Sequence, residues 1–188
     1  MPNTQYLYLV RHALTQPTAL PAETWLLSDV GLQQAQRLAE LPFWQDVQII
    51  YSSVEPKALQ TAQIAAERHS LPVEPVFDLR ELRRPNGLTS TEAYQAAVRE
   101  ALENPARSIH GWEPAGEAQT RIMTAIERLL MLHEGETLAV VSHGLVLTLY
   151  LAYLDDMPPN YETWKSLPFA CAIQVDPEAR SILNRFTV

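Results

Sequence analysis

The sequence predicts a three-layer α/β/α sandwich with a mostly parallel sheet and an antiparallel edge strand. Short runs rich in apolar and β-branched residues alternate with longer segments of helical spacing, which is typical of α/β proteins. The runs at 7–10 and 138–141 are continuously apolar, as expected for parallel strands covered on both faces. The last two runs, 170–175 and 182–186, are separated by a short turn segment and therefore predict an antiparallel hairpin.

The first part of the chain predicts a strand, a loop and a helix, followed by a second strand. The run at 6–10 is the first strand, and the proline-rich stretch from Gln16 to Glu23 is a loop. Ser28 begins a helix whose apolar residues recur at helical spacing until Pro42 closes it. A short strand at 47–51 follows.

The middle of the chain predicts a helix, an edge strand and a long excursion. The helix spans about 55–68 and has Pro56 in its first turn, where proline is tolerated. The run at 71–77 contains two prolines, so it suits the edge of the sheet better than the centre. The polar, turn-rich segment 83–114, with one helix at about 91–102, is expected to leave the core and cover a site.

The last part of the chain predicts the longest helix, a central strand and a buried helix. The segment 117–133 has an apolar face and ends before Gly135. The strand at 138–141 follows, and 145–154 is an almost wholly apolar helix that should be buried. We expect residues 1–188 to form a single domain, since this length suits one hydrophobic core.

Composition excludes several classes of function. The net charge of −8 argues against a general nucleic-acid surface, which needs a basic face. The single cysteine, Cys171, allows neither an internal disulfide nor a cysteine-based metal cluster. No signal peptide and no membrane-spanning apolar run is recognisable, so we expect a cytoplasmic protein without a membrane partner.

Two histidines stand in matching positions. His12 and His143 each follow a strand-forming run directly, and each precedes small residues. The carboxyl ends of parallel strands meet at one edge of a sheet, and open α/β proteins bind their ligands there. The sequence therefore predicts a functional site that contains both histidines.

The chain resembles the histidine phosphatase superfamily, in particular its phosphoglycerate mutase-like branch. The resemblance covers nearly the whole chain, and it rests on the order and spacing of several short motifs rather than on any one of them. The matching segments are Arg11-His12-Ala13, Leu27-Ser28 to Gly31 with Gln34-Ala35, Ser52-Ser53 through Ala58, Gln60, Thr61 and Ala62, Leu79-Arg80-Glu81, Gly116-Glu117 with Arg121, and Ser142-His143-Gly144.

This resemblance implies the chemistry of the site. His12 would attack phosphorus as a neutral imidazole, with its tautomer fixed by a backbone carbonyl near Ala13. His143 would donate to the transferred phosphate, more strongly if protonated, and Arg11 would bind the same group. Glu81 would protonate the leaving oxygen and then activate water. No metal or cofactor is required.

The chain departs from the family pattern at the same site. Lys57 stands where an arginine is usual, and lysine lacks the planar fork that binds phosphate through two donors. Ala13 replaces a glycine, which adds a methyl group where the backbone would approach a ligand or adopt a positive φ. Leu14 replaces a polar residue. These changes predict an activity that is attenuated or specialised.

Other candidate residues have both a functional and a structural interpretation. Thr15 could donate its hydroxyl to phosphate or close a turn, and Lys57 could be a solvated charge. Arg83, Arg84 and Asn86 could bind a second anionic group of the substrate or form a solvated basic loop.

Three further interpretations concern Glu81, a possible ion pair and the remaining histidines. Glu81 could instead pair with a neighbouring arginine. Glu117 and Arg121 have the spacing of an exposed ion pair but could lie under the site. The remaining histidines are expected on the surface. They are His69, His110 and His133.

The sequence thus predicts a metal-independent phosphomonoester hydrolase that acts through a phosphohistidine. A mutase would use the same pocket, and a phospho-ligand-binding regulatory protein without turnover is the alternative from another class. The expected partner is a small-molecule phosphate ester or a phosphorylated protein. The sequence does not indicate an oligomeric state.

Overall fold

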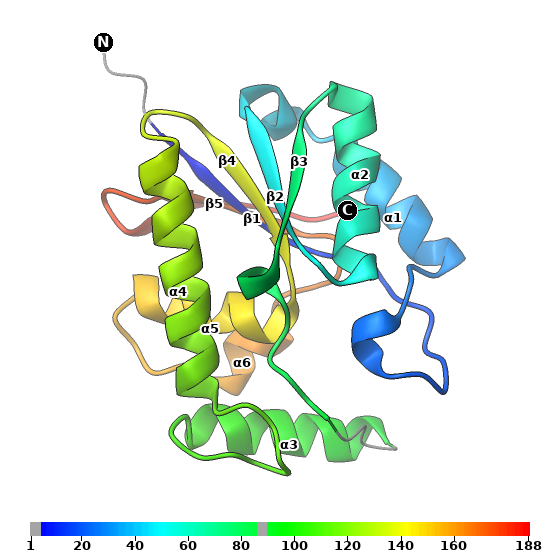
Figure 1. Ribbon diagram of the computed structural model, residues 1–188, viewed down its shortest axis with the longest axis vertical. Coiled ribbons are helices and arrows are strands. Elements are labelled where there is room, and N and C mark those ends of the chain that lie inside the picture. The colour runs from blue at the N-terminus through cyan, green and yellow to red at the C-terminus, as the bar shows by residue number, and fades with distance from the viewer. Residues whose placement is uncertain (1–4, 86–89) are drawn as a thin grey trace.

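The computed structural model describes residues 5–85 and 90–188, and the strands of these residues form a six-stranded sheet (Figure 1). The order is β3-β2-β4-β1-β5-β6. The strands are β1 (Leu7–Arg11), β2 (Ile49–Ser53), β3 (Val73–Val76), β4 (Leu138–Ser142), β5 (Ala172–Asp176) and β6 (Ser181–Phe186).

The first four strands in sequence run parallel to one another, and the last two form the hairpin. β5 pairs antiparallel with β1, and β6 pairs antiparallel with β5. β3 occupies an edge, as the two prolines of the run at 71–77 predict. The predicted α/β class, the mostly parallel sheet and the terminal hairpin are confirmed.

Helices cover both faces of the sheet because the side chains of each central strand alternate between two cores. Leu7 and Leu9 pack with α4 and α5, whereas Tyr8 and Val10 pack with α1 and α2. These helices are α1 (Asp29–Ala39), α2 (Pro56–His69), α4 (Ala115–Leu132) and α5 (Gly144–Leu154). Ten of the eleven residues of α5 are buried, which confirms its predicted position.

Several short elements were not predicted. They are three 3-10 helices, η1 (Ala22–Thr24), η2 (Pro42–Asp46) and η3 (Phe77–Leu79), and the one-turn helix α6 (Tyr161–Lys165). η1 lies partly in the stretch predicted as loop, and η3 shortens the predicted third strand. Such short turns have too few residues to show a periodic pattern.

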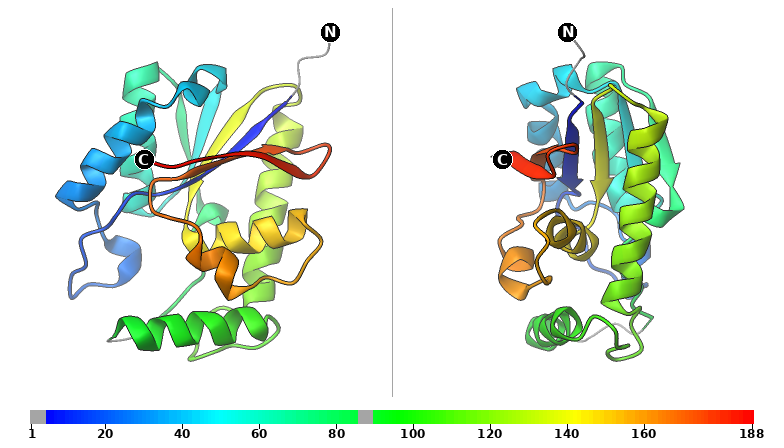
Figure 2. Two further views of the ribbon diagram at one scale, coloured as in Figure 1. Left: turned by 180° about the vertical axis from the view of Figure 1, so that it is seen from behind. Right: turned by 90° about the vertical axis from the view of Figure 1, so that its left-hand side faces the viewer.

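The excursion carries α3 (Thr91–Glu103) beyond the carboxyl end of the parallel strands. Figures 1 and 2 show α3 below α5 and α6 in every view. Its buried residues belong to the same hydrophobic cluster as α4 and α5, and Trp112 anchors the returning chain with 1% of its surface exposed. The excursion is thus packed onto the core on the side where the strands end.

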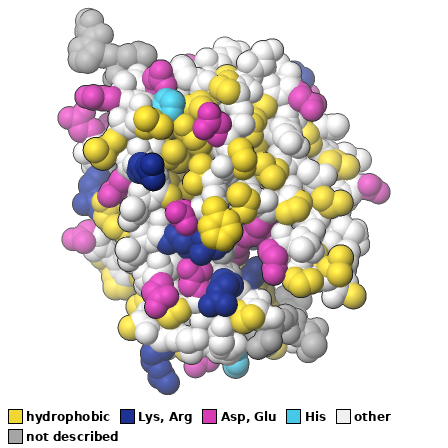
Figure 3. Space-filling model, in the orientation of Figure 1, with side chains coloured by type: hydrophobic (Ala, Val, Ile, Leu, Met, Phe, Trp, Pro, Cys, Tyr) yellow, Lys and Arg dark blue, Asp and Glu magenta, His cyan; other side chains and the backbone are white. Residues whose placement is uncertain are grey.

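No helix of the described residues is long and apolar enough to cross a membrane. On the face shown in Figure 3, basic side chains lie close to acidic ones and form no continuous basic surface.

A close backbone contact fixes the segment after β1 against α1. The carbonyl oxygen of Leu14 accepts a hydrogen bond from the N–H of Ser28 at 3.0 Å, and the Ser28 hydroxyl caps α1 by accepting from the N–H of Gly31 at 3.0 Å. A Cβ added to Gly31 would clash with the Leu14 carbonyl oxygen and lie 2.9 Å from its carbon.

We therefore expect Gly31→Ala to lower the free energy of unfolding by about 1–3 kcal/mol, since backbone must move to relieve the clash. Urea denaturation measures this change. The control is Gln33→Ala, at an exposed position of the same helix, which should change stability little. An equal stability of Gly31→Ala and wild type would contradict the close contact.

Candidate active site

Two histidine rings lie next to each other at the carboxyl end of the parallel strands. β1 and β4 pair with Arg11 opposite Ser142, and the N–H of His12 donates to the carbonyl of Ser142 at 3.0 Å. The rings of His12 and His143 meet edge to face, with centroids 5.0 Å apart. Only 5% of His12 and none of His143 is exposed.

A backbone carbonyl fixes the tautomer of His12. Its Nδ1 lies 2.8 Å from the carbonyl oxygen of Ala13, which can only accept, so we assign the proton to Nδ1. The lone pair is then on Nε2, as a nucleophile requires. This contact is the one that the sequence predicted.

A serine hydroxyl orients His143. Its Nε2 lies 2.7 Å from Oγ of Ser53, and the same Oγ accepts a hydrogen bond from the N–H of Glu55 at 3.2 Å. We assign the Ser53 hydroxyl as the donor to Nε2, which places the imidazole proton of His143 on Nδ1. The Nδ1 atom is buried and has no hydrogen-bond partner among the described residues.

Both histidines are neutral in this environment. Burial lowers the pKa of His12 to about 3, with Arg11 and Lys57 acting in the same direction and the Ala13 carbonyl opposing them. Burial and the neighbouring His12 hold the pKa of His143 well below its ordinary value. His143 is thus a neutral donor in the free protein, not the imidazolium that would bind phosphate more strongly.

Arg11 lies beside the start of α5. Its guanidinium carbon sits 4.2 Å from the ring centroid of Phe169, and Nη1 donates to the carbonyl of Leu167. A Cβ on Gly144 would come within 3.0 Å of the guanidinium carbon, so the glycine leaves room for it. The Nε atom is buried without a partner among the described residues, so its N–H is available to a ligand.

Lys57 is buried at the start of α2 and is not a solvated charge. Its Nζ forms an ion pair with the carboxylate of Glu55 and donates to the carbonyl of Ala22 at 2.7 Å. Only 4% of Lys57 and 7% of Glu55 is exposed. The ammonium is therefore positioned by two acceptors, one of them in the loop after β1.

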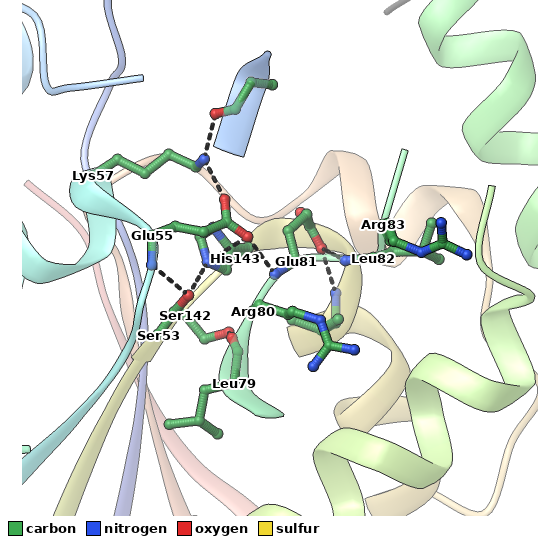
Figure 4. A network of polar contacts seen from close by, with 12 residues as sticks. Ser53, Glu55, Lys57, Leu79, Arg80, Glu81, Leu82, Arg83, Ser142 and His143 are labelled. Atoms are coloured by element: carbon green, nitrogen blue, oxygen red, sulfur yellow. Dashed lines mark hydrogen bonds and ion pairs between the residues drawn. The ribbon is translucent and has the colours of Figure 1, made fainter. Parts of the chain in front are cut away.

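Glu81 points toward the start of α5, as Figure 4 shows. Its Oε1 accepts from the N–H groups of Leu82 and Val146 at 2.9 and 3.1 Å, and its Oε2 accepts from Leu145 at 3.2 Å. A carboxylate at a helix N-terminus is stabilised by the unpaired N–H groups and the helix dipole. Glu81 thus lies at the helix that His143 begins, not in a pair with a neighbouring arginine.

Residues 7–182 match the family model described as histidine phosphatase superfamily, branch 1. The chain belongs to this family. The resemblance inferred from short motifs is therefore confirmed, and the match includes both histidines, Lys57 and Glu81.

Curated relatives of this chain carry mutase and phosphatase names. Phosphoglycerate mutase-like protein 4 of Arabidopsis thaliana is 38% identical over 134 residues, which are 64% of this chain and 56% of the plant protein. A probable phosphoglycerate mutase of Yersinia enterocolitica is 31% identical over 72% of this chain and 66% of its own. The Escherichia coli adenosylcobalamin/alpha-ribazole phosphatase is 28% identical over 81% of this chain and 80% of its own.

The chain spans only part of some relatives. The match covers 56% of the plant protein and 39% of a Caenorhabditis elegans 6-phosphofructo-2-kinase/fructose-2,6-bisphosphatase, which is 25% identical over 92% of this chain.

Solved structures share the fold of this chain. A phosphoserine phosphatase of Entamoeba histolytica, bound to phosphoserine, superposes with a TM-score of 0.78 at 18% identity and covers 96% of each chain. A mycobacterial glucosyl-3-phosphoglycerate phosphatase gives 0.76 at 23% identity, covering 91% of this chain and 92% of its own.

The residues predicted to bind substrate do not share one environment. Arg84 is half-buried, donates to the hydroxyl of Tyr94, and lies over the ring of Trp112 with 5.8 Å to its centroid. Its charge helps to lower the pKa of both histidines, which puts it near the site. Arg83 is exposed, and Asn86 lies outside the described residues.

The interpretation of Glu117 and Arg121 as an ion pair is wrong. Glu117 is exposed, whereas Arg121 pairs with the carboxylate of Glu113 through two nitrogens, at 3.0 and 2.9 Å. Arg121 also donates to the carbonyls of Asp78 and Arg80 at 2.7 and 2.9 Å. It therefore holds the segment that carries Glu81. For Arg121, this agrees with the alternative interpretation that the residue lies under the site.

The remaining predicted residues have local roles. Thr15 forms an isolated antiparallel bridge with Leu27 at the base of the 16–26 loop. Ala13 is fully buried in the core beside α1 and α2. The residues with positive φ lie elsewhere, so the methyl group of Ala13 is accommodated without backbone strain.

Of the remaining histidines, His110 is exposed as predicted, whereas His69 and His133 are half-buried. Nε2 of His69 lies 2.7 Å from the carbonyl oxygen of Ala39, and His133 has two partners. Its Nε2 lies 2.7 Å from the hydroxyl of Tyr51, and its Nδ1 lies 2.5 Å from the carboxylate of Glu136. This chain of contacts joins the end of α4 to β2, away from the two central histidines.

Sequence reasoning missed Glu55 and Phe169. Glu55 was noted only as the start of a helix, although its position two residues before Lys57 was the available signal. Phe169, which contacts both Arg11 and His12, gave no signal because it follows an irregular segment.

We expect His12 and His143 to stay neutral from about pH 5 to 8, because both pKa values are lowered by folding. Imidazole ¹⁵N shifts measure this, and His12 should show a protonated Nδ1 and an unprotonated Nε2. Folding should also be favoured above about pH 6.5 and weaken below it, since unfolding allows both rings to take up protons.

The urea-denatured protein is the control for these shifts, since both rings should then titrate near pH 6.5. Titration of His12 near that pH in the folded protein would contradict the assigned environment.

Proposed function

We propose that this member of the family is a metal-independent phosphomonoester hydrolase that acts through a phosphohistidine on His12. The observation that carries the proposal is the opposite use of the ring nitrogens in the two neutral histidines: Nδ1 is occupied in His12, whereas Nε2 is occupied in His143. His12 has Nδ1 bonded to Ala13 and a lone pair on Nε2, whereas His143 has a proton on the unpartnered Nδ1. One ring is prepared to attack phosphorus and the other to donate to its oxygens.

In the first step of this mechanism, Nε2 of His12 attacks phosphorus as the ester bond to the leaving oxygen breaks. Nδ1 of His143, Nε of Arg11 and the third N–H of Lys57 donate to the equatorial oxygens. Glu81 gives its proton to the leaving oxygen. We assign this transfer to Oε2, which accepts only the 3.2 Å bond from Leu145, whereas Oε1 accepts two bonds.

In the second step, Glu81 takes a proton from water, and the water oxygen attacks the phosphorus of phosphohistidine. The N–P bond breaks, the electron pair returns to Nε2 of His12, and inorganic phosphate leaves with Glu81 protonated for the next cycle. The carbonyl of Ala13 keeps the ring in one orientation throughout. No metal or cofactor takes part.

The proposed substrate is a small-molecule phosphate ester or a phosphorylated protein with a second anionic group. Arg84 supports this, because it is a half-buried cation near the histidines that is braced by Tyr94 and Trp112. We propose that the 83–114 excursion covers the site, within a single domain, and brings Arg84 to the substrate. Arg83, Asn86 and Thr15 remain candidates for contacts with the substrate. We propose the cytoplasm as the place of action.

The direct test is hydrolysis of an aryl phosphate in the presence of a chelator. We expect steady release of the phenol, and a fall of at least about 10³-fold in kcat for His12→Ala, since the nucleophile is lost. The matched control is His110→Asn, because asparagine tolerates the positive φ of that exposed position.

Other outcomes of this assay identify the alternatives. Transfer of the phosphoryl group to a second hydroxyl rather than to water would indicate a mutase. Binding of phosphate esters without turnover would indicate a regulatory protein and would overturn the hydrolase proposal.

We attribute any attenuation of activity to Lys57 and not to Ala13. The ammonium sits between Glu55 and the carbonyl of Ala22, a space that a guanidinium fills only by displacing the loop. We therefore expect Lys57→Arg to lower kcat/KM by about tenfold.

Lys165→Arg, at an exposed lysine, is the control for this substitution and should leave the rate unchanged. A higher rate for Lys57→Arg would show instead that lysine is merely a weaker clamp.

A further inference from the structure

A buried carboxylate stands among the groups proposed to bind phosphate. Glu55 is 7% exposed and uses both of its oxygens within the site. One oxygen pairs with Lys57, and the other accepts from the N–H of Glu81 at 2.8 Å and lies 3.5 Å from Nε2 of His143 (Figure 4).

Glu55 therefore contacts three of the proposed catalytic groups. It comes from the N-cap position of α2, yet its carboxylate caps nothing in that helix. A structural role in the helix would place it on the N–H groups of α2. Its contacts instead run to the segment of Glu81 and to the ring that follows β4.

Glu55 places a negative charge where a further anion would bind. The cations around it are Arg11, Lys57 and Arg84, whereas Glu81 is the proposed proton donor. A phosphate dianion would bring two more negative charges next to Glu55. Like charges repel more strongly in a protein site than in water, because the effective dielectric is lower there.

Loss of the charge on Glu55 removes this conflict and frees Lys57. The ammonium has three N–H donors, two of which are used by Ala22 and Glu55. Protonation of Glu55 would weaken its hold on the ammonium and turn the carboxylate into a donor for the incoming oxyanion.

We propose that Glu55 couples oxyanion binding to the uptake of one proton: the site binds a dianion tightly only when the Glu55 carboxylate has become a carboxylic acid. The inference rests on the proposed function, since it assigns the oxyanion to the same pocket. Glu55 is a positioning residue here, because it acts through Lys57 and through the charge of the pocket.

Burial supports this assignment. It raises the pKa of Glu55, with Lys57 acting in the opposite direction and Glu81 in the same direction. The other titratable groups that face Glu55 are His143 after β4 and, at the end of β1, its neighbour His12. Both could also take up a proton beside a bound anion, so the experiment must separate them from Glu55.

Sulfate is the appropriate probe because it keeps both charges throughout the neutral range and cannot turn over. Calorimetry of wild type between about pH 6 and 8 should show sulfate binding that weakens by up to tenfold per pH unit, as uptake of one proton requires. Titrations in buffers of different ionisation enthalpy should show the uptake of close to one proton.

Glu55→Gln removes the charge and keeps the size of the side chain. We expect this variant to bind sulfate at least about tenfold more tightly than wild type near pH 8, with little pH dependence and almost no proton uptake. Glu67→Gln, at an exposed position of α2, removes the same charge from the protein and should behave like wild type.

Three results would overturn the proposal. The first is sulfate binding by wild type without proton uptake, a measurement that needs no variant. The second is a wild-type pH dependence in Glu55→Gln, which would assign the proton to a histidine. If neither protein binds sulfate at any pH, the oxyanion pocket itself and the proposed function fail as well, whereas the first two results leave the proposed function intact.

Discussion

The in-register pairing of β1 with β4 is the constraint on which the site depends. With Arg11 opposite Ser142, the next residue of each strand is a histidine, and the two rings meet with centroids 5.0 Å apart. Both are removed from water, and burial favours the neutral form of each. What distinguishes them is the partner of each ring: a carbonyl that can only accept for His12, and a hydroxyl that can donate for His143. Two similar positions in the sequence thus become a nucleophile and a donor.

The buried charges around the histidines are held by pairing rather than by solvent. Lys57 is held by Glu55, Glu81 by the N–H groups at the start of α5, and Arg121 fixes the segment that carries Glu81. Removing one member of such a pair leaves a charge in a place of low polarity, which costs more than an exposed pair contributes. The same contacts also restrict phosphate binding, because a substrate phosphate must share these donors or replace their present partners. Binding energy and the protonation of the pocket are therefore linked.

The fold and the two histidines follow from the sequence because both depend on pattern. Alternating strands and helices, the prolines of the run at 71–77 and the terminal hairpin are local signals, and the strand-end histidines follow from the parallel sheet. The pairing of charged side chains was harder to predict from the sequence. Arg121 had Glu117 at helical spacing but pairs with Glu113, which precedes α4 and returns from the excursion. The sequence could not show that Lys57 and Glu55 are buried together, since two adjacent charges at a helix start are usually solvated. α6 and the 3-10 helices are too short for periodicity to predict.

The most direct measurement is the identification of the residue that carries the phosphoryl group during turnover. Protein mixed rapidly with an aryl phosphate and quenched in alkali, where the N–P bond survives, can be digested and analysed by mass spectrometry. The account predicts one added phosphoryl group on the peptide that contains His12, attached at Nε2 and absent from the peptide that contains His143. A phosphoryl group on another residue, or steady hydrolysis with no phosphorylated peptide in rapidly quenched samples, would contradict it.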